Sequence, residues 1–189
     1  MKEIHILPND LYITNYCDGR CTPFQSISRL SVEAAHALAR DLSQHRGDAF
    51  TSFSRFGQED FHGYYEKRLR TEAWLYGKFL SLGGKPQTSH PLYFVLGHSD
   101  FLKAWYEDGH ETRLRLADIQ PNHVSFTYGD SMSQLDKPSR LDPFTKDTLM
   151  DFIRKDHNMN VHEFLNALNR DNRYIEVQLW SDEYVAHNA

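Results

Sequence analysis

Apolar residues recur at helical spacing in two stretches of the chain. The first follows Ser31, whose side chain suits a helix N-cap, and ends near His45. The second is longer and precedes Gly83 and Pro86; glycine favours the left-handed cap and proline stops a helix. We therefore expect helices over residues 31–45 and 59–82. The apolar positions are Val32, Ala35, Leu38, Ala39 and Leu42 in the first, and Phe61, Tyr65, Leu69, Ala73, Tyr76 and Leu80 in the second.

Alternating and continuous apolar segments predict strands. Residues 11–14, 112–116, 124–128 and 174–180 alternate, whereas residues 91–96 are continuously apolar, which is typical of a central strand buried on both faces. Residues 120–122 carry turn formers, so segments 112–116 and 124–128 are expected to form a hairpin.

Shorter elements complete the expected order. Ser99 or Asp100 can cap a short helix, Asp142-Pro143 predicts another helix start, and Asn160 can cap a third. Residues 50–57 are expected to be irregular or a bulged strand. This order is not a regular βαβ alternation. It predicts an α+β fold, one domain over residues 1–189, with a mixed or mainly antiparallel sheet against several helices.

The composition and charge of the chain favour some partners and cellular locations over others. The 189 residues are 40% apolar and carry a net charge of −5, which suits a globular chain and argues against nucleic acid as a partner. The N-terminus lacks a signal-peptide core, and no apolar run approaches the roughly 20 residues that span a bilayer, so we expect a cytoplasmic protein without membrane contact. Cys17 and Cys21 are expected to be free thiols. The histidines match no metal motif, so no metal is expected.

The last strand suggests a ligand cleft. Its odd-numbered residues from Ile175 to Leu179 would face the core, and its even-numbered residues the opposite side. An aromatic ring, a carboxylate, an amide and an indole in one row would suit a small polar ligand, although a half-solvated sheet face, or a sheet face covered by a helix, explains the same alternation. The residues of this row are Tyr174, Glu176, Gln178 and Trp180, and Ser125 and Thr127 are added from the neighbouring expected strand.

This row resembles the E-x-E or Q-x-E strand of ADP-ribosyltransferases. The resemblance implies an enzyme that uses NAD, with Glu176 as its carboxylate and Arg55 or Arg68 as its arginine. Gln178 stands where that family has its catalytic acid, so the pattern is incomplete.

A second resemblance concerns Gly129-Asp130-Ser131, which is similar to the G-D-S motif of GDSL-type esterases and implies Ser131 as a nucleophile. That family places the motif near the N-terminus and supplies a D-x-x-H motif late in the chain. Here Asp182 and His187 are separated by four residues, and no base can be assigned to Ser131. A turn that ends a strand explains the same residues.

Two more positions are candidates for ligand binding. On the long helix Arg68 is close in sequence to Tyr64 and Tyr65, so it would bind an anion beside aromatic rings or simply pair with Glu72 at the surface. His98 precedes a helix start, where anions bind, but a helix cap accounts for that segment too.

The segments L-Y-F-V-L-G-H-S and Y-I-E-V-Q-L-W-S-D-E-Y resemble a microbial protein family of unknown function, which implies no activity. We therefore expect a binding or interaction domain with a cleft for a small polar ligand and no recognisable catalytic constellation. An NAD-dependent transferase and a serine hydrolase remain alternatives, no cofactor can be named, and a homodimer is an alternative use of exposed aromatic residues. The expected ligand-binding residues are Tyr65, Arg68, His98, Ser125, Thr127, Glu176, Gln178 and Trp180.

Overall fold

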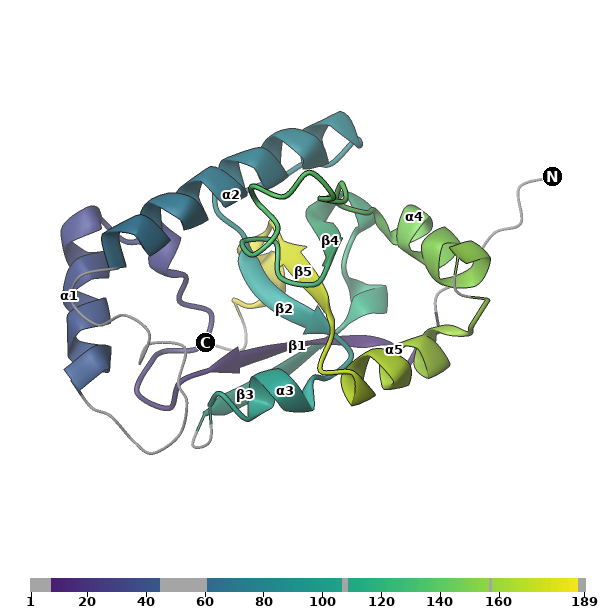
Figure 1. The fold of residues 1–189 in the computed structure, drawn as a ribbon, viewed down its shortest axis with the longest axis horizontal. Coiled ribbons are helices and arrows are strands. Elements are labelled where there is room, and N and C mark those ends of the chain that lie inside the picture. Colours follow the sequence, from purple (N-terminus) through teal and green to yellow (C-terminus); the bar gives the residue numbers. More distant parts are fainter. Residues whose placement is uncertain (1–7, 45–60, 107–108, 157, 187–189) are drawn as a thin grey trace.

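A five-stranded antiparallel sheet forms the centre of the molecule (Figure 1). The computed structural model describes residues 8–44, 61–106, 109–156 and 158–186. The strand order β3-β1-β2-β5-β4 places the continuously apolar segment in the middle, as expected, and confirms the α+β class. The strands are β1 (Tyr12–Cys17), β2 (Leu92–Leu96), β3 (His110–Arg115), β4 (Val124–Tyr128) and β5 (Ile175–Leu179).

Five α-helices accompany the sheet within the described residues: α1 (Val32–Gln44), α2 (Phe61–Ser81), α3 (Asp100–Lys103), α4 (Lys146–Asp151) and α5 (Val161–Arg170). Three expected caps are confirmed. The Ser31 hydroxyl accepts from the Ala34 N–H at 3.2 Å, the Ser99 hydroxyl accepts from Leu102, and Asn160 caps α5. Gly83 adopts φ +87° two residues after the end of α2. His45 and residues 50–57, including Arg55, lie outside the described residues.

The expected helix start at Asp142-Pro143 is wrong. Helix α4 begins at Lys146, with Thr145 as its N-cap. The backbone of Phe144 is instead paired with Phe126 of β4 through hydrogen bonds of 2.7 and 3.0 Å. Because this bridge holds residue 144 in an extended conformation, the helix can start only after it.

The expected hairpin between residues 112–116 and 124–128 is also wrong. β3 and β4 lie at opposite edges of the sheet, since β3 pairs with β1 and β4 pairs with β5. Their connection contains two 3-10 turns, η2 (Leu116–Asp118) and η3 (Pro121–His123). Leu116 and Ile119 are buried in the core, so the connection crosses beneath the sheet instead of reversing at its edge.

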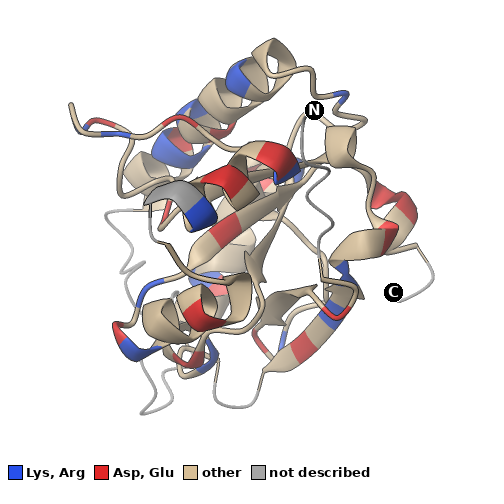
Figure 2. Cartoon of the chain, turned by 90° about the vertical axis from the view of Figure 1, so that its right-hand side faces the viewer, with Lys and Arg blue, Asp and Glu red and all other residues tan. Residues whose placement is uncertain are grey.

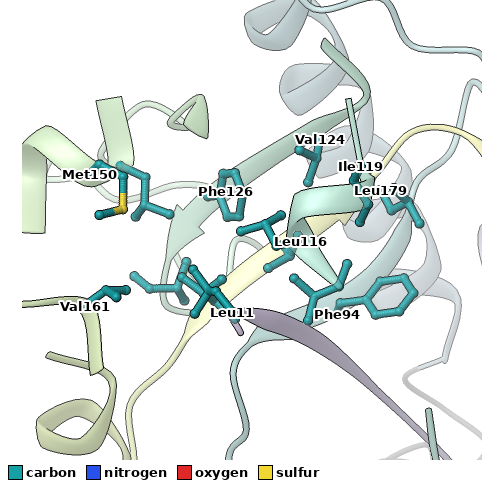
Figure 3. Packing of buried hydrophobic residues seen from close by; sticks show 14 of the residues in the cluster. Leu11, Phe94, Leu116, Ile119, Val124, Phe126, Met150, Val161 and Leu179 are labelled. Carbon is teal, nitrogen blue, oxygen red and sulfur yellow. The ribbon is translucent and has the colours of Figure 1, made fainter. Parts of the chain in front are cut away.

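The apolar face of the sheet packs against α4, the π-helical turn η4 (Phe152–Asp156) and α5. Met150 of α4 and Val161 of α5 lie over strand residues such as Phe126, as Figure 3 shows. This face contains the odd-numbered residues of β5, as the alternation predicted. The buried members from the strands are Ile13, Leu92, Phe94, Leu96, Val124, Phe126, Ile175, Val177 and Leu179.

The opposite, polar face lies under α2, which runs across it in Figure 1. Phe79 of α2 stacks on Trp180 with ring centroids 5.8 Å apart, and the Arg68 guanidinium lies 4.5 Å from the centre of the Tyr93 ring. α1 packs against the N-terminal half of α2 through Ala35, Ala39, Phe61 and Tyr65. Basic and acidic residues are interspersed over the elements in Figure 2. None of the described helices is both long and apolar enough to cross a membrane.

Candidate functional site

A cleft of about 510 Å³ opens between α2 and the polar face of the sheet. β1 pairs with β2 only through Ile13 and Thr14, and beyond this point the two strands separate (Figure 1). The cleft occupies this region and is also bordered by the segment that follows β1. Its lining is rich in aromatic rings and includes the charged residues Asp18, Lys67, Arg68, Asp130 and Glu176.

The carboxylate of Glu72 fixes α2 over the polar face. Its side chain is fully buried. The Ser28 hydroxyl donates to it at 2.9 Å, and the Nε of Arg68 lies 3.0 Å from the same oxygen. His90 Nδ1 lies 2.6 Å from the second oxygen. A buried carboxylate is tolerated when each oxygen has partners of this kind, and here the partners come from three separate segments.

Arg68 is held in one orientation at the cleft wall. Besides Glu72, its Nη1 donates to the Tyr64 hydroxyl at 3.2 Å, and its guanidinium covers the Tyr93 ring. Burial alone would lower the pKa of Arg68, but Tyr64, Tyr93 and Glu72 outweigh this effect and raise it. Burial and Glu72 raise the pKa of the Tyr93 phenol well above its usual range, so this ring stays neutral. The arginine therefore contributes a fixed positive charge.

A series of hydrogen bonds crosses the polar face from Trp180 to Glu176. The Trp180 indole donates to Ser125 at 2.9 Å, and Ser125 donates to the Gln178 carbonyl at 2.8 Å. The Gln178 amide then donates to Thr127 and to Glu176, each at 3.0 Å. Each donor in this series has the next group as its acceptor. The last acceptor is a carboxyl oxygen of Glu176.

Glu176 is half-buried and lies in the cleft lining. Burial and the nearby Asp130 carboxylate raise its pKa to about 7, while Ser131, Gln178 and Arg68 act in the opposite direction. A carboxyl group that exchanges its proton near neutral pH can accept a hydrogen bond from a ligand, pair with a cation, or transfer a proton.

The structure brings two of the expected site residues, Arg68 and Glu176, to one cleft. Tyr65 is buried between α1 and α2, and His98 is exposed beside Asn169. Thr127 lines a second, smaller pocket. Three others are fully buried in the hydrogen-bonded series beneath α2: Ser125, Gln178 and Trp180.

Ser131 does not meet the geometry expected of a nucleophile. Its side chain is only 2% exposed, and no hydrogen bond between described residues joins it to a histidine. Asp130 forms a turn, since its Oδ1 accepts from the Met132 N–H at 2.8 Å and the Ser133 N–H at 3.3 Å. Gly129 adopts φ +73°, which a residue with a side chain rarely does.

Cys17 and Cys21 also line the cleft. Both are free, and the Cys17 thiol donates to the Asp18 carbonyl at 3.4 Å. The proximity of the two thiols raises the pKa of Cys17 and lowers that of Cys21. The turn between them is closed by the Cys21 N–H, which donates to the Asp18 carbonyl at 2.9 Å.

Sequence patterns missed Tyr93 and Asp130. Tyr93 is directly opposite Gln178 in the β2–β5 pairing, so it shares the polar face with Glu176. The phenol within an otherwise apolar segment was the available signal, but only the strand register links it to β5. Asp130 reaches the cleft through the turn after β4, which the G-D-S pattern did not indicate.

No family model matches the chain, and neither a curated protein nor a solved structure matches it. Within the residues that the structure describes, no group of three or more His, Cys, Asp or Glu side chains is arranged to hold a metal ion. The cleft therefore has to be interpreted from its own geometry.

Replacement of Glu72 by glutamine should lower the free energy of unfolding by about 2–4 kcal/mol, because Arg68 stays buried without its carboxylate. Urea denaturation measures this change. The exposed Glu66 on the same helix is the control: E66Q should change the value by less than about 0.5 kcal/mol. The double variant Arg68→Met/Glu72→Met should be less destabilised than E72Q, because it removes both charges together. A larger loss of unfolding free energy in the double variant would contradict the pairing of Arg68 with Glu72.

Glu176 should make stability fall with rising pH. The unfolded chain releases this proton near the ordinary glutamate pKa of 4.5, but the folded chain retains it until about pH 7. The free energy of unfolding therefore starts to fall above the pKa of the unfolded chain and stops falling above the pKa of the folded chain. The total decrease is at most roughly 3 kcal/mol. E176Q cannot ionise, so its stability relative to the native protein should rise between about pH 5 and about pH 8. Urea denaturation across this pH range measures the difference in the free energy of unfolding, with E66Q as the control. If the free energies of E176Q and the native protein change with pH in parallel, the raised pKa is refuted.

Proposed function

We propose that this protein binds a small polar ligand in the cleft between α2 and the sheet, with Glu176 receiving the ligand's hydrogen-bond-donating or cationic group. The observation that carries the proposal is the half-buried Glu176 carboxyl in a cleft of about 510 Å³, with its pKa raised to about 7. This volume is within the range of small-molecule sites, which are lined by aromatic residues and a few placed polar groups.

The charges of the cleft favour a ligand with a positive group. Asp18 is paired with Arg20 at 2.8 Å, and Arg68 with Glu72 at 3.0 Å, so the two charges within each pair neutralise each other. The other charged lining residues are Lys67, which is positive, and the two acidic residues Asp130 and Glu176. Asp130 and Glu176 lie close enough for Asp130 to raise the pKa of Glu176. A cation placed between the two carboxylates would relieve their repulsion and displace the proton of Glu176.

The walls favour a ligand with a ring. Aromatic side chains from five parts of the chain line the cleft, and planar rings stack on such surfaces at low cost in side-chain entropy. The fixed stacking of Arg68 on Tyr93 keeps one of these rings in place. The aromatic lining residues are Tyr16, Phe24, Tyr64, Tyr93, Phe94, Trp105, Tyr106 and Tyr174.

Three probes with the same phenol ring test this proposal: tyramine, which is cationic, para-ethylphenol, which is neutral, and para-hydroxyphenylacetate, which is anionic. At about pH 8, where Glu176 is ionised, tyramine should bind about tenfold more tightly than the other two, because only it pairs with the carboxylates. Titrations followed by NMR shifts of the cleft residues give the three dissociation constants.

In E176Q the preference for tyramine over para-ethylphenol should disappear, whereas E66Q should retain it. Tighter binding of the anion would reverse the proposed ligand charge. If none of the probes gives a saturable shift of the cleft signals at millimolar concentration, the cleft is not a ligand site of this kind.

A second candidate, an NAD-dependent transferase resembling ADP-ribosyltransferases, is favoured by one observation: Glu176 and Arg68 line the same cleft. Gln178, at the family's catalytic position, is fully buried and bound to Thr127, which weighs against it. NAD should then raise the melting temperature, because a ligand that binds only the native state stabilises it. Native protein, but not E176Q, should release nicotinamide. No shift with millimolar NAD would remove this candidate.

A further inference from the structure

The thiols of Cys17 and Cys21 lie together in the turn that follows β1 and borders the larger cleft. Cys17 is the last residue of β1, and the chain turns directly after it, since the Cys21 N–H donates to the Asp18 carbonyl at 2.9 Å. The Sγ atom of Cys17 lies 3.6 Å from the carbonyl oxygen of Cys21 and 3.7 Å from that of Thr22. The Cys17 side chain therefore reaches the backbone of the residue that carries the second thiol.

Polar contacts that do not involve the thiols hold this turn. The Arg20 guanidinium pairs with the Asp18 carboxylate through Nε at 2.9 Å and Nη2 at 2.8 Å, and the Arg20 N–H donates to the same carboxylate at 3.0 Å. Nη1 of Arg20 donates to the Leu42 carbonyl of α1 at 3.2 Å, which joins the turn to that helix. A turn fixed in this way keeps the two thiols together before any bond forms between them, and this favours a reaction within one chain over a reaction between two.

A small reagent can reach both thiols, because each cysteine is half-buried and lines the cleft of about 510 Å³. The two thiols differ in acidity. The neighbouring Cys17 thiol and then Arg20 lower the pKa of Cys21, whereas the Cys21 thiol and burial raise the pKa of Cys17. Since the thiolate is the nucleophile, Cys21 is the thiol that reacts first.

We propose that Cys17 and Cys21 form a redox-active dithiol, which a small-molecule disulfide converts reversibly into an intramolecular disulfide. The site lies at the border of the larger cleft, but it does not depend on a ligand binding there.

The exchange has two steps. Cys21 releases its proton to the solvent, and its thiolate attacks one sulfur of the small disulfide. The S–S bond of the reagent breaks, one small thiolate leaves and takes up a proton, and Cys21 carries a mixed disulfide. Cys17 then releases its proton and attacks the Sγ of Cys21, and the second small thiolate leaves and is protonated. Two electrons thus pass from the two cysteines to the reagent, which is released as two thiols.

Oxidised glutathione is the probe, applied to the full chain after reduction with dithiothreitol and removal of this reductant. The remaining thiols are then blocked with N-ethylmaleimide, and the masses of the protein and of its tryptic peptides are measured. Trypsin cleaves after Arg20, between the two cysteines, so a disulfide is detected as two joined peptides. Native protein should give these joined peptides, with neither glutathione nor N-ethylmaleimide on either cysteine, and dithiothreitol should restore both thiols.

The single variants Cys17→Ser and Cys21→Ser are the matched controls, because each keeps one thiol and can form only a mixed disulfide. In a buffer of about 1 mM reduced and about 0.1 mM oxidised glutathione, each variant should carry glutathione on about one tenth of its molecules. More than half of the native protein should hold the internal disulfide, because the second thiol is present at a high effective concentration.

Circular dichroism establishes that each variant is folded, and the native protein decides alone if a variant is not. Three results with native protein would each overturn the proposal. They are two free thiols in this buffer, a stable glutathione adduct in place of the internal disulfide, and disulfide-linked dimers on non-reducing electrophoresis.

Discussion

The buried carboxylate of Glu72 is the interaction on which the arrangement of the cleft depends. It joins Ser28 before α1, Arg68 on α2 and His90 before β2 at one point. A long helix over a polar sheet face gains less from apolar burial than a helix over the opposite face, so specific polar contacts must fix its position. With α2 fixed, Arg68 lies over Tyr93 and closes one wall of the cleft.

The buried groups of the polar face satisfy one another's hydrogen bonds, and every bond of the series donates in the direction from Trp180 to Glu176. Trp180 can only donate, and Glu176 as a carboxylate can only accept, so the amide and hydroxyls between them have defined orientations. The stacking of Phe79 on Trp180 excludes water from the far end of this series. Glu176 is consequently presented to the cleft by a rigid strand rather than by a mobile loop, and its oxygen is pre-oriented toward whatever enters.

Local patterns predicted local structure well, because caps and alternation depend on neighbouring residues. The alternation of residues 174–180 correctly assigned both faces of β5. Strand neighbours were not predictable in the same way: the turn chemistry near Pro121 suggested a hairpin, but Leu116 and Ile119 gain more by entering the core. The pairing of Arg68 with Glu72 was visible from their spacing. Its burial was not, since Ser28 and His90 are distant in sequence.

The turn after Gly129 directs two consecutive side chains to different pockets. Asp130 lines the larger cleft, where carboxylates predominate, and Ser131 lines the smaller pocket, where Arg140 is the charged group. Glu176 interacts electrostatically with both turn residues, so a cation that lowers its pKa in the cleft also strengthens its attraction for the Ser131 hydroxyl. The turn after Gly129 therefore supplies one side chain that raises the pKa of Glu176, Asp130, and one that lowers it, Ser131.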